Sequence, residues 1–321
     1  MRRLILSFVL TMCVTHLMAQ TQVESHTYRY ATKDGQELML DIYTSSTQDS
    51  LARPCMIFAF GGGFVQGNRN HEYYTRYFNH LASEGIVVAS IDYRLGLKNP
   101  PKNLNIRGVI DLMQHAVDIA VEDIYSATCY LIENHTMFNI DTAKIMLSGS
   151  SAGAIASLQA EWRRCNGDSI ADILPNDFRY AGIVACAGAL FSAHGKPKFD
   201  TEPAPMLLFH GTSDGNVPYN KSSLFGIGFY GSKYVAKQLD KIDAPYWFYS
   251  AEYANHKLAG TPLWYQCDLI MQFISDFVIE KNRMRIRTGV EYIGKERRQT
   301  HFTPKEYLEN NYKRKQQPAT N

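Results

Sequence analysis

Apolar stretches of strand-like length alternate along the chain with stretches that repeat apolar residues at helical spacing. Residues 26–32 and 37–44, separated by the turn sequence KDGQ, predict a β-hairpin. Further strands are predicted at residues 55–60, 86–93, 144–149, 180–189, 205–211 and 245–252. Helices are predicted at residues 71–85, 120–135, 152–162, 232–242 and 265–281. This alternation predicts an α/β fold: a mostly parallel central sheet with an antiparallel N-terminal hairpin and helices on both faces.

Three segments do not follow the alternation. Residues 96–115 and 218–231 are expected to be loops over a site at the edge of the sheet. Residues 282–321 are polar and basic, and we expect a surface extension there. Because no internal repeat and no Pro-, Gly- or Ser-rich linker divides the rest, residues 21–281 are predicted to form a single domain.

The N-terminal residues 1–20 have two arginines, a short apolar run and a small residue near the end, which is typical of a secretory signal peptide. The run is too short to span a membrane, so export to the periplasm or the exterior is expected without stable membrane insertion. A buried first helix is the alternative. We do not expect a lipid anchor at Cys13, because Met12 stands where a small residue is needed.

Composition excludes several other classes of function. The net charge is only +2, and no basic stripe with interleaved aromatic residues is present, so nucleic-acid binding is not expected. The sequence His71-Glu72 lacks the second histidine of a HExxH site, and no phosphate-binding glycine motif follows a strand, so no metal or cofactor is predicted. Without the signal peptide five cysteines remain with no regular spacing, which leaves only a Cys165–Cys267 bridge open.

The segment GSSAG holds the candidate nucleophile. Among its neighbouring serines only Ser151 has glycine two residues before and two residues after it, at Gly149 and Gly153. A nucleophile elbow needs this spacing, because the tight turn between a strand and a helix brings backbones together where only glycine fits. A predicted strand ends and a predicted helix begins at this point, whereas Ser148 and Ser150 do not meet the spacing.

A serine hydroxyl needs a base to take its proton and an acid to orient that base. Asp214 lies in a glycine-rich turn after the predicted strand 205–211, and His256 lies just after the next predicted strand. Both therefore follow Ser151 in the order acid then histidine, at the carboxyl ends of parallel strands where ligands bind in such sheets. The alternative for Asp214 is a simple turn former beside Gly215.

Acyl transfer also needs donors for the negative charge that develops on the carbonyl oxygen. Three glycines follow the predicted strand 55–60, and the amides of Gly62 and Gly63, with that of Ala152 after the nucleophile, are the candidate oxyanion donors. A tight turn alone would explain one glycine more readily than three.

Five segments, FGGGFVQGNR, VVASIDYRLG, FNIDTAKIMLSGSSAGA, HGTSDGNVP and ANHK, resemble in order and spacing the α/β-hydrolase esterases of the hormone-sensitive-lipase and carboxylesterase type. The resemblance extends to secreted bacterial acetyl and feruloyl esterases. It implies the α/β-hydrolase fold, a Ser151–Asp214–His256 triad and oxyanion donors at Gly62, Gly63 and Ala152. One departure is Phe60, where the family has the histidine of HGGG.

The resemblance implies hydrolysis of a small-molecule or oligosaccharide ester, such as an acetyl or feruloyl ester on plant polysaccharide. HGTSDGNVP is shared with dienelactone-hydrolase-like and prolyl-oligopeptidase-like enzymes, so an exported serine peptidase or amidase is the alternative. A non-catalytic binding protein on the same scaffold is a third interpretation. Aromatic residues near the motifs could line the substrate pocket or simply pack in the core. They are Phe64, Tyr73, Phe225, Phe229, Tyr230 and Trp264.

Overall fold

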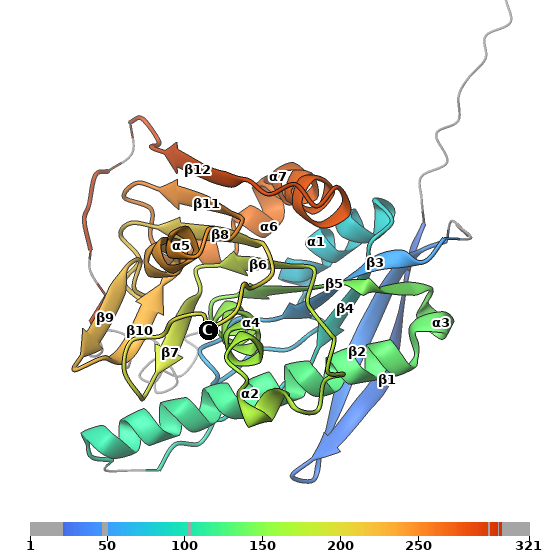
Figure 1. Ribbon diagram of the computed structural model, residues 1–321, viewed down its shortest axis with the longest axis horizontal. Helices are drawn as coiled ribbons and strands as arrows, with labels where there is room; N and C mark the ends of the chain where they lie inside the picture. The colour runs from blue at the N-terminus through green and yellow to red at the C-terminus, as the bar shows by residue number, and fades with distance from the viewer. Residues whose placement is uncertain (1–21, 47–50, 102–103, 295, 301, 304–321) are drawn as a thin grey trace, which may run out of the picture.

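A nine-stranded sheet forms the centre of the computed structural model, which describes residues 22–46, 51–101, 104–294, 296–300 and 302–303 (Figure 1). The strand order is β1-β2-β4-β3-β5-β6-β8-β11-β12. The bounds are β1 Val23–Lys33, β2 Gln36–Ser45, β3 Arg53–Ala59, β4 Val87–Ile91, β5 Ile140–Ser150, β6 Gly182–Cys186, β8 Met206–Gly211, β11 Tyr246–Ala251 and β12 Arg285–Val290. β1 pairs antiparallel with β2 and β2 with β4, whereas the other pairs are parallel. The predicted sheet and its N-terminal hairpin are confirmed.

Helices cover both faces of this sheet, with α2 and α4 packed together on one face and α1 and α7 on the other (Figure 1). Every residue of β4, β6 and β8 is buried, as expected for parallel strands between two helical layers. The helices are α1 Glu72–Ser83, α2 Ile106–Glu133, α3 His135–Phe138, α4 Ala152–Cys165, α5 Ser232–Lys241, α6 Pro262–Tyr265 and α7 Cys267–Phe273. A π-helix continues α7 over Ile274–Ile279, and single 3-10 turns lie at Ser169–Ala171 and His256–Ala259.

Two segments that we expected to be loops contain regular structure. Residues 106–115 form the first turns of α2, whose start is capped by the Asn105 side chain accepting the Gly108 amide at 2.8 Å. Residues 221–231 form a hairpin of β9 Lys221–Leu224 and β10 Ile227–Gly231, and β10 also pairs with β7 Ala189–Ser192. The loop prediction is wrong for residues 106–115 and 221–231. Pro100 and Pro101 mask the helical spacing in the first segment, and the second segment is too short and glycine-rich to show strand alternation.

The sheet continues past the boundary predicted at Lys281. β12 pairs in parallel with β11 from Tyr246↔Arg285 to Ala251↔Val290, and it forms the last strand of the sheet. Its exposure alternates along the strand, as it does in an edge strand with one covered face. The first part of the predicted extension therefore belongs to the sheet. The predicted signal peptide, Cys13 and residues 304–321 lie outside the described residues.

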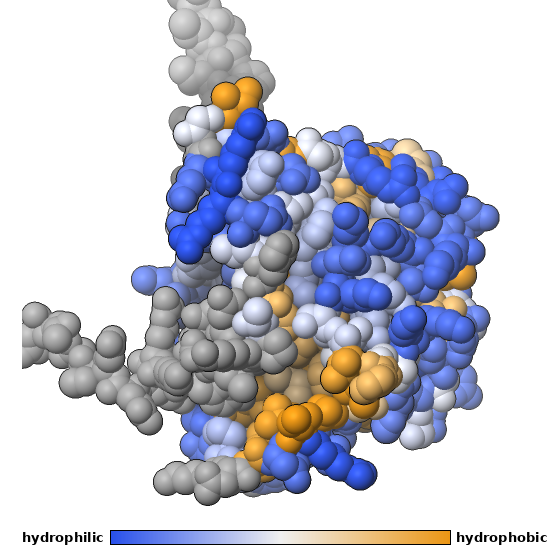
Figure 2. Space-filling model, turned by 90° about the vertical axis from the view of Figure 1, so that its left-hand side faces the viewer, coloured by the Kyte–Doolittle hydropathy of each residue, from blue (hydrophilic) through white to orange (hydrophobic). Residues whose placement is uncertain are grey.

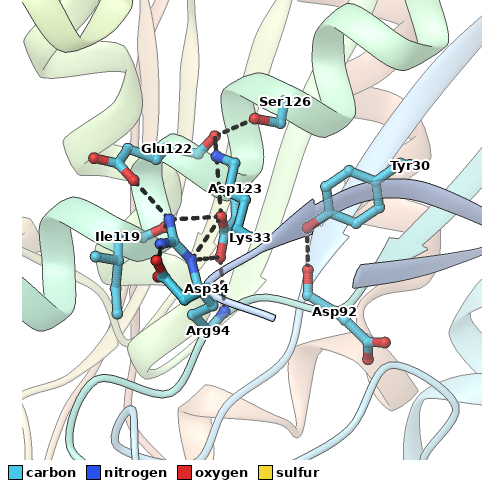
Figure 3. Close-up of polar contacts among 9 residues, drawn as sticks. All are labelled: Tyr30, Lys33, Asp34, Asp92, Arg94, Ile119, Glu122, Asp123 and Ser126. Atoms are coloured by element: carbon cyan, nitrogen blue, oxygen red, sulfur yellow. Dashed lines mark hydrogen bonds and ion pairs between the residues drawn. The ribbon is translucent and has the colours of Figure 1, made fainter. Parts of the chain in front are cut away.

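A buried ion cluster ties the segment after β4 to the N-terminal hairpin and to α2 (Figure 3). The carboxylate of Asp123, which is fully buried, accepts the Arg94 backbone amide at 2.7 Å and the Arg94 guanidinium at 2.9 Å. The same guanidinium donates to Asp34 in the turn between β1 and β2 and to Glu122, both at 2.6 Å. Lys33 Nζ lies 3.2 Å from Asp123. A buried carboxylate is costly without partners, so the partners of Asp123 must stay in place for the fold to be stable. In this way the cluster holds together three elements that are far apart in sequence.

Candidate functional site

Ser151 lies at the turn between β5 and α4 with a backbone φ of 51°, a conformation that residues with side chains rarely adopt. The two flanking glycines make this turn possible. A Cβ on Gly149 would lie 2.4 Å from the Gly153 carbonyl carbon, and a Cβ on Gly153 would lie 2.0 Å from the Ala59 oxygen at the end of β3. The glycine spacing that selected Ser151 is therefore required by backbone packing, and it presents the Ser151 side chain at the carboxyl end of the sheet.

The His256 side chain lies against Ser151, with Ser151 Oγ 2.8 Å from His256 Nε2. His256 begins the short 3-10 turn His256–Ala259, which follows β11 and is capped by Asn255, whose side chain accepts the Lys257 amide at 3.1 Å. The imidazole is about one-fifth exposed. A hydroxyl and an imidazole at this distance can exchange a proton without further movement.

Asp214 holds the other side of the imidazole. Its Oδ2 lies 2.8 Å from His256 Nδ1, while its Oδ1 accepts the backbone amides of Asn216 and Val217 at 2.8 and 2.9 Å. The residue is 2% exposed. The structure thus brings the three predicted side chains into one hydrogen-bonded chain from hydroxyl to imidazole to carboxylate.

A second histidine, His210 at the end of β8, also contacts this carboxylate. It is completely buried, with Nε2 3.5 Å from Asp214 Oδ2 and 3.2 Å from the Val217 carbonyl oxygen, and Nδ1 2.8 Å from Ser232 Oγ. Burial by itself raises the pKa of Asp214, but the charge of His256 and hydrogen bonds from His210 and His256 outweigh it and hold the pKa well below its usual range. His210 belongs to the HGTSDGNVP segment, but nothing in that motif marks it as a partner of the acid, so this contact was not predicted.

The glycine loop lies directly beside the elbow. A Cβ on Gly61 would lie 3.0 Å from Ser150 Oγ, and the Gly61 amide donates to the Tyr74 hydroxyl at 3.2 Å. Gly62 and Gly63 follow with φ values of 134° and 66°, and the Gly62 carbonyl accepts the Val65 amide at 3.1 Å. Ala152 begins α4, where the amides of the first helical turn carry partial positive charge. Two of the predicted donors therefore belong to a loop that adjoins Ser150, and the third is the first residue of α4.

Phe60, which stands where the resemblance expects histidine, is held by packing. Its ring stacks on Tyr93 with centroids 4.4 Å apart, and the Tyr93 hydroxyl donates to the Phe60 carbonyl at 2.7 Å. The strand end before the glycines is thus fixed by an aromatic stack and one hydrogen bond to the backbone.

Of the six aromatic candidates, Tyr73 and Trp264 lie together. Their ring centroids are 5.3 Å apart, and Trp264 Nε1 donates to the Tyr73 carbonyl at 2.8 Å. A Cβ on Gly260, four residues after His256, would lie 2.6 Å from the Tyr73 hydroxyl oxygen, so this pair adjoins the segment that carries the base. Tyr73 is about one-third exposed and is available for contact with a ligand.

The other four candidates are spread over the core and the β9–β10 hairpin. Phe64 and Tyr230 are fully buried, which agrees with the core packing given as their alternative role. Phe229 packs against Phe191 and Phe302, with centroids 5.0 and 5.9 Å apart. Phe225 is 94% exposed at the tip of the hairpin.

Figure 2 views the molecule from the left of Figure 1, where β11 and β12 end, and shows apolar side chains gathered beside a hollow on that face. The β9–β10 tip and the start of α2 lie on this side. Phe225 and Leu224 at the tip and Ile106 at the start of α2 are all more than two-thirds exposed. Isolated exposed apolar residues are ordinary, but a group beside a hollow suits a ligand with an apolar part.

Two cavities flank the loops that carry the acid and the base. One of about 380 Å³ is lined by Asp214, Thr300, Phe302 and neighbours that include Lys221 and Lys233. The other, of about 700 Å³, is lined by Asn255 and Lys257, the sequence neighbours of His256. Its remaining walls are Glu252, Tyr253, Ala254, Leu258, Thr261, Tyr265, Gln266, Tyr292, Glu296 and Arg297.

The described part of the chain holds no group of three or more His, Cys, Asp or Glu residues placed to bind a metal ion. Among the described helices, none is long and apolar enough to cross a membrane. Cys165 and Cys267 are both free thiols, so the bridge that the sequence left open is not formed.

Comparison with known proteins finds esterases among the proteins that this chain resembles. The sequence model of the family described as BD-FAE matches residues 40–172. The esterase LipI of Mycobacterium tuberculosis is 29% identical over 121 residues, which cover 37% of this chain and 32% of LipI. The isoprenylcysteine alpha-carbonyl methylesterase ICME of Arabidopsis thaliana is 24% identical over 224 residues, 58% of this chain and 48% of ICME. The chain thus spans less than half the length of either curated relative.

Among solved structures, the propionate-bound esterase 2 of Thermogutta terrifontis superposes with a TM-score of 0.58 at 21% identity, covering 81% of this chain and 96% of that one. At this identity the match establishes the fold. Together these similarities confirm the predicted α/β-hydrolase fold and the resemblance to carboxylesterases.

Proposed function

We propose that this α/β-hydrolase-fold protein hydrolyses carboxylic esters through an acyl-enzyme on Ser151. The observation that carries the proposal is the hydrogen-bonded chain from Ser151 through His256 to Asp214 at the carboxyl end of the sheet. The esterase names of the curated relatives support the reaction class.

In the first step His256 Nε2 takes the Ser151 proton while Ser151 Oγ attacks the ester carbonyl. The Asp214 carboxylate keeps the Nδ1 proton of His256 in place and stabilises the charge that the imidazole gains. His256 then protonates the leaving alcohol. A water molecule that gives a proton to His256 then attacks the acyl-enzyme, and His256 returns that proton to Ser151 Oγ as the acid leaves.

The amides of Gly62, Gly63 and Ala152 are the proposed donors to the oxyanion. The positive φ values at Gly62 and Gly63 allow this loop to turn beside the elbow. Each such donor typically stabilises the transition state by ~3 kcal/mol. Backbone donors need no reorganisation as charge develops, because the fold fixes their direction.

For the substrate we propose a small acyl group, such as acetyl, or an aryl acyl group, such as feruloyl, on an oligosaccharide alcohol. The solved Thermogutta terrifontis esterase was obtained with propionate and with butyrate bound, which supports a short acyl chain. The exposed apolar group of Figure 2 suits an aryl group, and the cavity lined by the sequence neighbours of His256 offers tyrosine and amide side chains to a polar alcohol. Export by the N-terminal signal peptide would bring the protein to such esters.

A panel of p-nitrophenyl esters, acetylated and feruloylated oligosaccharides and aminoacyl amides tests this function. We expect the wild-type protein to hydrolyse esters and to leave the amides intact. Ser151→Ala should lose activity by a factor on the order of 10⁴ or more, with an unchanged circular dichroism spectrum. Faster cleavage of the amides would favour a peptidase. A folded wild-type protein inactive on the whole panel would contradict the proposal.

A further inference from the structure

The loop that carries Asp214 is braced on its inner side by the loop that carries the base. The Thr212 amide donates to the Ala251 carbonyl at 2.9 Å, and the Ser213 amide donates to the Ala254 carbonyl at 3.0 Å. These bonds extend the pairing of β8 with β11 beyond the last paired residues of the sheet. These bonds use the N–H groups of Thr212 and Ser213, and the carbonyl groups of the two residues remain available to other donors.

The carbonyl groups of Thr212 and Ser213 accept hydrogen bonds from the C-terminal segment, the residues that follow β12 up to Thr300. Gln299 Nε2 donates to the Thr212 carbonyl at 2.9 Å, and the Thr300 hydroxyl donates to the Ser213 carbonyl. The Ser213 carbonyl belongs to the same peptide unit as the Asp214 amide, which donates to the Gly211 carbonyl at 3.3 Å. The peptide plane next to the acid is therefore held at both ends, and Thr300 holds one of them.

The C-terminal segment reaches this position because it is anchored before and after the two contacts. β12 joins it to the sheet, and the Glu252 amide donates to the Val290 carbonyl at 2.7 Å where β12 ends. An ion pair between Glu291 and Arg297, 2.7 Å apart, crosses the turn that follows. Beyond Thr300, the Phe302 ring packs 5.9 Å from that of Phe229.

We infer that Gln299 and Thr300 are positioning residues for Asp214, and that they form a strap across the outer side of the acid loop. The inference rests on the proposed function, in which Asp214 must stay 2.8 Å from His256. A misplacement of about 1 Å in such a constellation can cost about a hundred-fold in rate. The strap also forms a wall of the cavity that Asp214 lines.

Single substitutions that remove one donor test the strap. Thr300→Val keeps the shape of the side chain without its hydroxyl, and Gln299→Met removes the amide. We expect each to lower kcat by about ten-fold with KM unchanged, and Thr300→Ser to restore the wild-type kcat. Thr201→Val is the matched control, because the Thr201 hydroxyl donates to a backbone carbonyl, that of Cys165, at the opposite end of α4 from Ser151.

A double-mutant cycle with Asp214→Asn distinguishes positioning from general destabilisation. If the strap acts through the acid, Thr300→Val will have little further effect in the Asp214→Asn background. A wild-type kcat in both strap variants, an equal loss in Thr201→Val, or full additivity with Asp214→Asn would overturn the inference.

Amide hydrogen exchange gives a measurement that needs no substrate. The Asn216 and Val217 amides, which donate to Asp214, should exchange faster in Thr300→Val than in the wild type and should be unchanged in Thr201→Val. Should the wild-type protein hydrolyse no ester, the proposed function fails, and unchanged exchange at these amides would separately overturn the strap.

Discussion

The elbow around Ser151 and the loop around Asp214 are positioned by different means. The tight turn of the elbow is set by glycines within one short segment, where Gly149 packs against Gly153 backbone to backbone, and Gly153 in turn fits against the end of β3. The acid loop is held by long-range partners: His256 from the next strand and Thr300 from the C-terminal segment. A short motif of five consecutive residues can therefore mark one part of a site in the sequence. The other part depends on contacts between residues that only the folded chain brings together.

Gly153→Ala should have the largest effect, because it breaks the locally fixed part. The new Cβ would lie 2.0 Å from the Ala59 oxygen, which is backbone and has little freedom to move. We expect a destabilisation of more than about 3 kcal/mol and loss of esterase activity. Gly289→Ala in β12 is the control, since a Cβ there meets no atom within 4 Å. Comparable urea midpoints for the two variants would contradict the account of the elbow.

Asp214→Asn breaks the part held by long-range contacts. The neutral amide no longer stabilises the charged imidazole, and it can leave His256 in the wrong tautomer, so kcat should fall by a factor on the order of 10⁴. Because the elbow does not depend on this residue, Ser151 should remain in place. Activity on p-nitrophenyl acetate checks the first expectation and a crystal structure the second. A loss of less than ten-fold would remove Asp214 from the mechanism.

The same residue gives a pH dependence of stability. The pKa of Asp214 lies below that of an unfolded aspartate, which is about 4. Its ionised form therefore stabilises the fold above about pH 4, and this contribution is lost as the pH falls through the lower folded pKa. Urea unfolding from pH 6 to pH 2 should show the difference between wild type and Asp214→Asn decreasing toward low pH. If the difference in unfolding free energy between the two proteins grew toward low pH, the pKa of Asp214 would be raised by folding, not lowered.

Arg94→Met should lower stability with less effect on chemistry. It leaves the buried Asp123 with Lys33 and without its Arg94 guanidinium partner, so we expect a loss of about 3 kcal/mol. The kcat of the folded fraction should stay near that of the wild type, because the cluster in Figure 3 consists of structural contacts outside the triad. Arg29→Met serves as the control, since the Arg29–Glu37 pair is more than half exposed and contributes less than about 1 kcal/mol.

The smallest effect is expected at Cys165. Burial raises the pKa of its thiol to about 12, so at neutral pH the thiolate is scarce and iodoacetamide should react slowly with the folded protein. Rapid alkylation of the native protein at Cys165, located by peptide mass spectrometry, would show that this region opens readily.

What the sequence could predict follows the same division. The strand, the glycines and the helix around Ser151 are contiguous, and the chain order of Asp214 and His256 places them at the same edge of the sheet, so the fold and the three side chains could be predicted. The strap could not, because Gln299 and Thr300 lie in a polar stretch with no periodicity. The sequence also left open whether Phe64 and Tyr230 line a pocket or pack in the core, because proximity to a motif does not reveal how far a side chain is buried.

The central claim, a nucleophilic Ser151, is tested most directly by trapping with a fluorophosphonate and mapping the adduct by mass spectrometry. The account predicts one adduct per protein, on the peptide that contains Ser148, Ser150 and Ser151, with fragmentation placing it on Ser151 and no adduct in Ser151→Ala. A folded wild-type protein that takes up no label, or a label located on Ser148 or Ser150, would contradict it.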